Sequence, residues 1–258
     1  MTMRQRSGIS FPGGALTGLL VCLLWQVLAN YGVTSQFLSS PVDIATALVR
    51  LTVSDSPSLP VHVLSSLLRT VIATGSGVSV GFALGLFAAR RAPYLIALAA
   101  FVAAIPGLIW LQMALLLVGL GDRPVILVGT IMAIPPMMIH TEKGISTVRR
   151  ELDWSARLMG ADLATRRYEV LLMAALPSLL TGFRLALARA WRAVIVAEFV
   201  GGVATGLGLT ILNARDLIKV DVMYGGLLVV GAIFFAIERW GIRPLEEEIA
   251  RKWGHAAP

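Results

Sequence analysis

The sequence is poor in the residues on which soluble enzymes depend. Only 14% of its 258 residues are charged, whereas about a quarter are charged in a typical soluble domain. Cys22 is the single cysteine, which excludes an intramolecular disulfide. The three histidines, His62, His140 and His255, are far apart, and no cluster of His, Cys or carboxylate residues has metal-ligand spacing. There is also no glycine loop of the phosphate-binding kind. We therefore expect no catalytic centre, cofactor or metal.

Apolar side chains are abundant instead, at 57% of the chain. Several apolar runs reach about 20 residues, the length of a helix that spans a bilayer. The sequence therefore predicts an all-α polytopic membrane protein, with residues 1–258 forming a single transmembrane domain because no internal repeat or second domain is visible. Six transmembrane helices are expected, at residues 14–32, 64–89, 94–119, 124–142, 178–203 and 222–241.

Local signals refine this picture. Ser40, Pro41 and Asp43 form a good helix start, which predicts a short amphipathic helix at the membrane interface. Pro106 in the third span and Pro135-Pro136 in the fourth predict kinked or broken helices. Such breaks at membrane depth usually line a cavity or pack against protein.

The distribution of Lys and Arg predicts the orientation. The net charge is +7, which in a soluble protein would suggest nucleic acid as a partner. Here most of the positive charge lies at the N-terminus, at 90–91, at 143–167 and in the C-terminal tail, and little of it lies in the loops between. The positive-inside rule then places both termini and the 143–167 segment in the cytoplasm, and we expect no nucleic-acid partner.

The segment 151–177, between the fourth and fifth spans, is too polar to enter lipid. Asp153 is a candidate N-cap, and Gly160 would end the short helix by adopting the left-handed conformation. Asp162 could then cap a second helix that runs to the region of Pro177. The pattern predicts a cytoplasmic helix–turn–helix.

That segment resembles the coupling motif of binding-protein-dependent ABC-importer permeases, in which Glu-Ala-Ala, three residues, Gly and nine residues precede Ile-x-Leu-Pro. The residues that match its register are Ala156, Gly160, Val170 and Leu172. The sequence departs from the motif at Trp154, Ser155 and Met173, where Glu, Ala and Pro are usual.

Further matches extend over nearly the whole chain and resemble the sulfonate, taurine, nitrate and bicarbonate branch of this family. They are Phe37 to Pro41, Ser66-Leu67-Leu68-Arg69, Gly119-Leu120-Gly121, Ala175-Leu176-Pro177, Gly182, Arg184, Trp191, Glu198, Gly206-Leu207-Gly208 and Asp221. The resemblance implies a type I ABC-importer permease fold in the inner membrane of a bacterium. It also implies a homodimer that works with two ATPase subunits and an extracytoplasmic binding protein, and that imports a small anionic solute.

In such a permease, Trp154, Ser155, Ala156 and Gly160 would form the contact with the ATPase. Ala156 would allow close approach, and Gly160 would allow the sharp exit of the chain. An aromatic residue at Trp154 could be a contact anchor. It could equally lie at the membrane interface, where tryptophan is common.

Ionisable residues inside apolar runs are costly and need an explanation. Arg69, Arg184, Glu198 and Glu238 resemble charges common in the branch and are most simply structural, paired or near helix ends. Arg189 and Arg192 match no such pattern.

Arg189 and Arg192 lie three residues apart and so share a helix face. They could line a path for an anion, together with Pro106 and Gln112, or they could pair with carboxylates across a subunit interface.

The main alternative is a stand-alone secondary transporter or another polytopic membrane protein, such as a membrane enzyme. A secondary transporter is expected to contain inverted repeats, and an enzyme is expected to contain a nucleophile or metal cluster. The sequence shows neither feature. The transported substrate does not follow from the sequence.

Overall fold

The computed structural model describes residues 12–31, 37–54, 56–147, 150–162, 165 and 170–252, and within these ranges the chain is helical, without strands. The helices, in order, are α1 (Pro12–Tyr31), α2 (Pro41–Val53), α3 (Leu59–Arg91), α4 (Tyr94–Ala104), α5 (Gly107–Val118), α6 (Asp122–Ser146), α7 (Arg150–Leu158), α9 (Leu172–Glu198), α10 (Leu207–Asp216), α11 (Val220–Ala236), the π-helix η2 (Ile237–Ile242) and α12 (Arg243–Lys252). The expected all-α architecture is confirmed.

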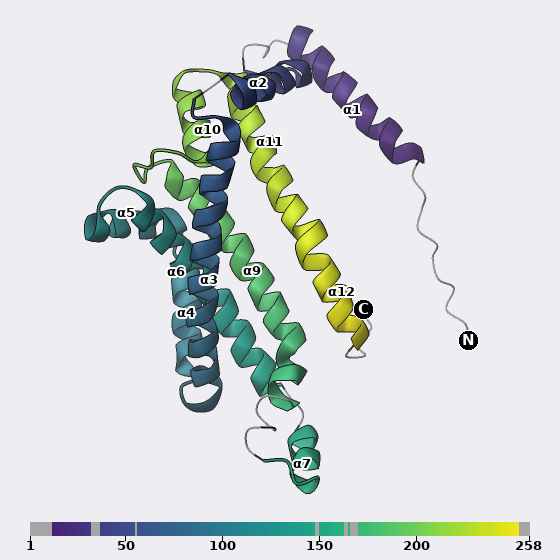
Figure 1. Cartoon of the computed structure of the whole chain (residues 1–258), viewed down its shortest axis with the longest axis vertical. Helices are drawn as coiled ribbons and strands as arrows, with labels where there is room; N and C mark the ends of the chain where they lie inside the picture. Colours follow the sequence, from purple (N-terminus) through teal and green to yellow (C-terminus); the bar gives the residue numbers. More distant parts are fainter. Residues whose placement is uncertain are drawn as a thin grey trace.

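The centre of the molecule is formed by α3, α6 and α9, which run alongside one another (Figure 1). Glycines on α3 allow it to approach α6 closely. A Cβ placed on Gly81 would lie 2.6 Å from the Ile134 carbonyl oxygen and 2.9 Å from the Met137 Cβ, and Gly77 and Gly85 are similarly tight. Small residues every four positions therefore form a packing seam, as is common between helices in lipid.

Two short helices, α2 and α10, lie at one end of this bundle, and α7 lies beyond its other end (Figure 1). The start of α2 is the predicted capping box, because Ser40 Oγ accepts from the Asp43 amide at 3.2 Å while the Asp43 carboxylate accepts from the Ser40 amide at 3.3 Å.

Each of the six expected spans falls on helical segments, but the count of six stays a prediction. By length and hydropathy, the described residues contain three helices able to cross a membrane: Leu59–Arg91, Asp122–Ser146 and Val220–Ile249. The pair α4 and α5 would make a fourth span if it counts as one. Helix α9 has 27 residues and so is about 40 Å long, but it carries Arg184, Arg189 and Arg192 and does not meet the same criterion.

The two proline sites behave differently. At Pro106 the predicted kink is a complete break, since α4 and α5 meet at 92°. Ile105 is extended, the conformation that a following proline favours. At Pro135-Pro136 the expected break is absent: α6 continues through both prolines, which are buried. Helices α3 and α9 pack along α6. These tertiary contacts keep α6 helical at the two prolines, although the local sequence disfavours a helix there.

The cytoplasmic segment also differs from the expectation in two places. Asp153 is not an N-cap, because α7 begins at Arg150. Pro177 does not end a second helix, because it lies inside α9, which begins at Leu172. The bond expected of Asp162 is present, from the Thr165 amide to its carboxylate at 3.0 Å. Of the second helix that was expected after Asp162, residues 163–164 and 166–169 lie outside the described residues.

Candidate functional site

A cavity of about 390 Å³ lies where α9 faces the junction of α4 and α5 and the middle of α6. The α9 side of the cavity is a stripe with helical spacing, and Ala103, Gly107, Leu108, Leu111 and Met132 complete the lining from α4, α5 and α6. The members of the stripe are Arg189, Arg192, Ala193, Val196 and Ala197. The break at Pro106 opens this space, because it turns α5 away from the bundle axis (Figure 1).

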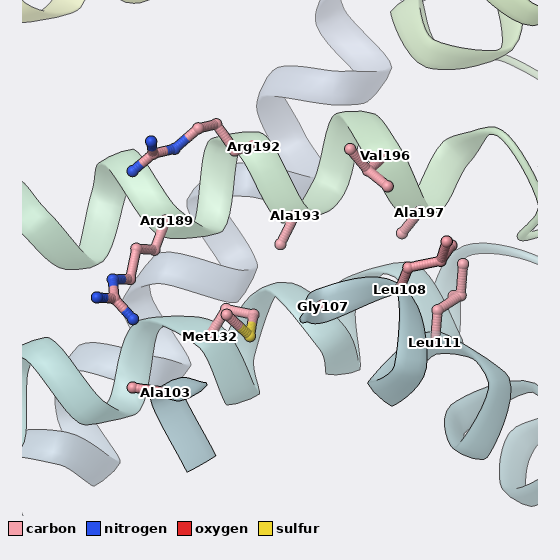
Figure 2. A pocket seen from close by; sticks show the side chains of 10 residues that line it. All are labelled: Ala103, Gly107, Leu108, Leu111, Met132, Arg189, Arg192, Ala193, Val196 and Ala197. Carbon is pink, nitrogen blue, oxygen red and sulfur yellow. The ribbon is translucent and has the colours of Figure 1, made fainter. Parts of the chain in front are cut away.

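The cavity has a cationic end and an apolar end. Figure 2 shows the guanidinium groups of Arg189 and Arg192 on one side, and Leu108 and Leu111 on the other. Along α9 the same change occurs between Arg189 and Ala197, which lies eight positions further on, or about 12 Å of helix. The arrangement can therefore receive a molecule that has a negative group and an apolar part.

Neither arginine has a carboxylate partner among the described residues, whose ion pairs involve other cations. Arg192 Nε donates to the Ala188 carbonyl oxygen at 3.0 Å, within its own helix. Its terminal nitrogens have no protein acceptor in the part of the chain that the structure describes. Since guanidinium nitrogens present several donors in a fixed fork, both side chains can donate to an incoming anion.

Glu198 and Glu238, two acidic residues within the apolar runs, are paired with other arginines. Glu198 is 1% exposed and accepts from Arg69 Nη1 at 2.6 Å. Glu238 pairs with Arg184, which also contacts Glu246 at 3.4 Å. The structural interpretation of Arg69, Arg184, Glu198 and Glu238 is thereby confirmed.

The described residues of this chain supply no carboxylate partner for Arg189 or Arg192. If the two arginines pair with carboxylates, those carboxylates belong to a second copy of the chain.

The Glu198 carboxylate accepts hydrogen bonds from two segments, α3 and the start of α10. Ser66 Oγ lies 2.8 and 2.9 Å from its two oxygens, and the Gly208 amide at the start of α10 donates at 2.8 Å. A Cβ on Gly206, whose φ is +159°, would lie 2.5 Å from the Glu198 Cδ. The loop before α10 can therefore close over the carboxylate only because glycine occupies this position.

The four residues predicted to form the pathway are only partly brought together. Arg189 and Arg192 line the cavity, whereas Pro106 and Gln112 are exposed and do not. Sequence reasoning missed Gly107, Leu108, Leu111 and Met132. The stripe on α9 could have been found by its spacing, but the α5 and α6 residues depend on how three helices meet.

The predicted coupling residues lie on α7 and the turn after it. Gly160 has φ +79°, its amide donates to the Arg157 carbonyl at 3.0 Å, and the Ala161 amide donates to the Ala156 carbonyl at 3.0 Å. This is a Schellman helix end, which confirms the expected left-handed role of Gly160. Ala156 is buried, at 8% exposure.

Other residues of α7 and the turn after it do present apolar surface. Trp154 is 61% exposed, and Leu158 and Met159 are more exposed still. Trp154 and Leu158 are four residues apart and share a helix face. An otherwise polar helix with large exposed apolar side chains, standing beyond the bundle (Figure 1), is typical of an interaction site.

Comparisons with known proteins agree with this architecture. The sequence model of the family described as "Binding-protein-dependent transport system inner membrane component" matches residues 77–237. The taurine transport system permease protein TauC of Escherichia coli (strain K12) is 26% identical over 90% of this chain and 86% of its own length. The bicarbonate transport system permease protein CmpB of Synechococcus elongatus (strain ATCC 33912 / PCC 7942 / FACHB-805) is 28% identical over 92% and 88%.

A solved structure shares the fold. A chain from the inward-facing MetNI methionine ABC transporter superposes with a TM-score of 0.64 at 22% identity, covering 74% of this chain and 95% of that one. The fold is therefore that of a type I ABC-importer permease. The chain belongs to the family of binding-protein-dependent transport system inner membrane components, as a membrane-embedded permease subunit of an ABC importer.

Proposed function

We propose that this chain carries a small anion across the inner membrane of a bacterium as one of two identical permease copies. Two ATPase subunits would drive the pair, and an extracytoplasmic binding protein would deliver the solute. In this proposal residues 1–258 form one transmembrane domain, both termini lie in the cytoplasm, and segment 151–177 is the coupling segment.

The observation that carries the anion assignment is the pair of guanidinium groups at the cavity. Arg189 and Arg192 lie on one helix face without carboxylate partners among the described residues. Two like charges at this spacing repel, and a charge in a membrane-spanning helix costs about 2.5–3.5 kcal/mol on insertion scales. An anion in transit, within a hydrated pore, offsets both costs. Two relatives are named for the transport of taurine and bicarbonate, which both carry a negatively charged group.

The coupling assignment is supported by α7 and its turn. The contact surface that we propose consists of Trp154, Leu158 and Met159, since these side chains are exposed. Ser155 belongs to the same exposed part of the helix, whereas Ala156 and Gly160 act by shaping it. Trp154 thus takes the role of a contact anchor, because a large aromatic side chain contributes strongly to binding when a partner buries it.

Reconstitution tests this function. The permease is co-expressed with its ATPase and its binding protein, and uptake of labelled taurine and bicarbonate is measured in proteoliposomes with and without internal ATP. We expect uptake of an anion that requires ATP, the ATPase and the binding protein. Uptake by the permease alone, driven by an ion gradient, would instead indicate a secondary transporter. Cross-linking of a cysteine-free variant that carries one introduced cysteine would test the two-copy arrangement.

A further inference from the structure

The turn between α10 and α11 holds an isoleucine in a backbone conformation that favours glycine. Ile218 has φ +55°, and among the described residues it is the only residue other than glycine with a positive φ. Its amide donates to the Arg215 carbonyl at 3.1 Å, and the Lys219 amide donates to the Ala214 carbonyl at 2.8 Å. These are the bonds of a Schellman helix end, in which glycine is usual at this position. A β-branched side chain is strained there, because its Cβ crowds the backbone.

The end of α7 shows that the chain uses glycine in the same motif elsewhere. Gly160 occupies the equivalent position, with φ +79° and the corresponding pair of hydrogen bonds. Packing within the described residues does not offset the strain at Ile218, because this residue is 76% exposed. Strained residues of this kind cluster where a function requires them. The isoleucine side chain is therefore available to contact a molecule outside the chain.

Ile218 forms an exposed apolar tip together with Leu217, which is 65% exposed. The residues on either side, Arg215, Asp216 and Lys219, are also exposed. Arg215 pairs with Asp216 at 2.8 Å, at the surface. Because charged side chains avoid the hydrocarbon region of a membrane, a tip that they flank faces water. An apolar centre with a polar rim is typical of a surface that binds another protein.

A cavity of about 520 Å³ lies beside the tip, between α10 and the turn that joins α2 to α3. Leu217 and Lys219 line it from the tip, and Arg50 and His62 line it from α2 and α3. Arg50 is paired with Asp221 at 3.0 Å. Lys219 has no carboxylate partner among the described residues, whose ion pairs involve other cations. The cavity can therefore receive a carboxylate from a partner.

We propose that the tip of Leu217 and Ile218 and the cavity beside it recognise the extracytoplasmic binding protein, with the tip in an apolar recess of that protein and one of its carboxylates at Lys219. This inference rests on the proposed function, which gives the chain such a partner, and it adds the residues that make the contact. Helix α10 lies at the end of the bundle opposite α7 (Figure 1). With α7 in the cytoplasm, the tip is on the side where the binding protein is.

Ile218→Gly separates recognition from a structural role. Affinity of the purified binding protein is measured for the permease–ATPase complex in phosphatidylcholine nanodiscs, together with thermal unfolding of the permease. Glycine relieves the strain, so the midpoint of unfolding should rise by about 2 °C. Binding should nevertheless weaken at least about tenfold, because an apolar side chain is lost from the interface. Unchanged affinity would overturn the inference, and so would a lower midpoint, which would assign Ile218 to the stability of the chain.

Two further substitutions control for flexibility and for exposure. Ile218→Ala should weaken binding to a similar degree, which excludes the freedom of glycine as the cause. Leu117 on α5 is also 76% exposed, and Leu117→Ala should leave the affinity unchanged. An equal loss in the Leu117 variant would show that recognition does not belong to the tip.

Lys219 tests the charged part of the contact. Lys219→Glu should weaken binding more than Lys219→Gln, because it places a carboxylate against the partner's carboxylate. Lys219→Gln should also make the affinity less dependent on salt, since one exposed ion pair is lost. Normal affinity in both variants would overturn the carboxylate contact.

A nitroxide label at Ile218→Cys, in a chain that also carries Cys22→Ser, identifies what covers the tip. A water-soluble nickel relaxation agent should reach the label in the complex alone, and a saturating concentration of binding protein should exclude it. Access by oxygen but not by nickel would place the tip in lipid. Exclusion of both agents before the binding protein is added would place it against a second copy. Either result would overturn the inference.

The unsubstituted complex distinguishes failure of this inference from failure of the proposed function. If the binding protein does not bind that complex at all, the proposed function fails and the inference fails with it. If the binding protein binds it, and binds the Ile218 and Lys219 variants equally well, the proposed function stands and only the assignment of the tip is overturned.

Discussion

The buried ion pair between Arg69 and Glu198 should respond very unequally to the loss of either partner. Arg69→Met leaves the Glu198 carboxylate, which is 1% exposed, without a counter-charge. Removing one member of a buried pair costs about 3–5 kcal/mol. Glu198→Gln is milder, because Arg69 keeps its 2.7 Å contact with Asp122. The expected loss is about 1.5–3 kcal/mol, the value of a hydrogen bond to a charged group.

The double variant Arg69→Met, Glu198→Gln gives the decisive comparison. It buries no uncompensated charge, so we expect it to be more stable than Arg69→Met alone by about 2 kcal/mol. Asp122→Asn is the matched control. Asp122 contacts the same guanidinium group but its side chain is 63% exposed, and exposed pairs contribute about 0–1 kcal/mol.

Equilibrium unfolding of the purified permease in mixed micelles measures these differences. The order of stability should be unsubstituted chain, then Asp122→Asn, Glu198→Gln, the double variant and Arg69→Met, with the middle pair close together. If Arg69→Met proved no worse than Glu198→Gln, or if the double variant were the least stable, the network would not be a charge-compensated core and the argument would be refuted.

Three other outcomes are expected. Gly160→Arg should abolish both co-purification of the ATPase and uptake while leaving membrane insertion intact, because the backbone at φ +79° and the Schellman bonds disfavour any side chain at this position. Normal transport by this variant would exclude α7 as the coupling contact. Gly81→Leu should destabilise the permease by about 3 kcal/mol or more, because the new side chain forces α3 away from α6. Gly75→Leu should be nearly neutral, because a Cβ there would meet nothing within 4 Å. Equal thermal stability of these two variants would contradict the packing seam. Reporter fusions after residues 120 and 215 should be extracytoplasmic and one after residue 160 cytoplasmic; an external signal at 160 would end the coupling argument.

Local chemistry predicted the helix ends well. The capping box at Ser40 and the left-handed Gly160 are each determined by a few adjacent residues, so the sequence alone was enough to find them. Asp153 failed as an N-cap because the helix extends three residues earlier, to Arg150. Boundaries of this kind depend on contacts beyond the local pattern.

Long-range features could be anticipated only in part. Arg69 and Glu198 each lie in an apolar run and so need an oppositely charged partner. Because 129 residues separate them, their spacing in the sequence cannot identify one as the partner of the other. Pro106 and Pro135 gave the same local signal, yet only Pro106 breaks its helix, because α6 is held between α3 and α9. The apolar half of the cavity was missed for the same reason: it exists only where α5, α6 and α9 meet.

The central claim is that Arg189 and Arg192 carry an anion, and charge-conserving substitution at Arg192 tests it most directly. Arg192→Lys and Arg192→Gln are reconstituted with the ATPase and the binding protein, and assembly, ATP hydrolysis and anion uptake are measured on the same preparations. Arg192→Lys should retain much of the uptake, because it keeps the positive charge. Arg192→Gln should assemble and hydrolyse ATP but lose uptake of the anion by tenfold or so, about 1.4 kcal/mol. Full uptake by Arg192→Gln, or loss of assembly in that variant, would contradict the account.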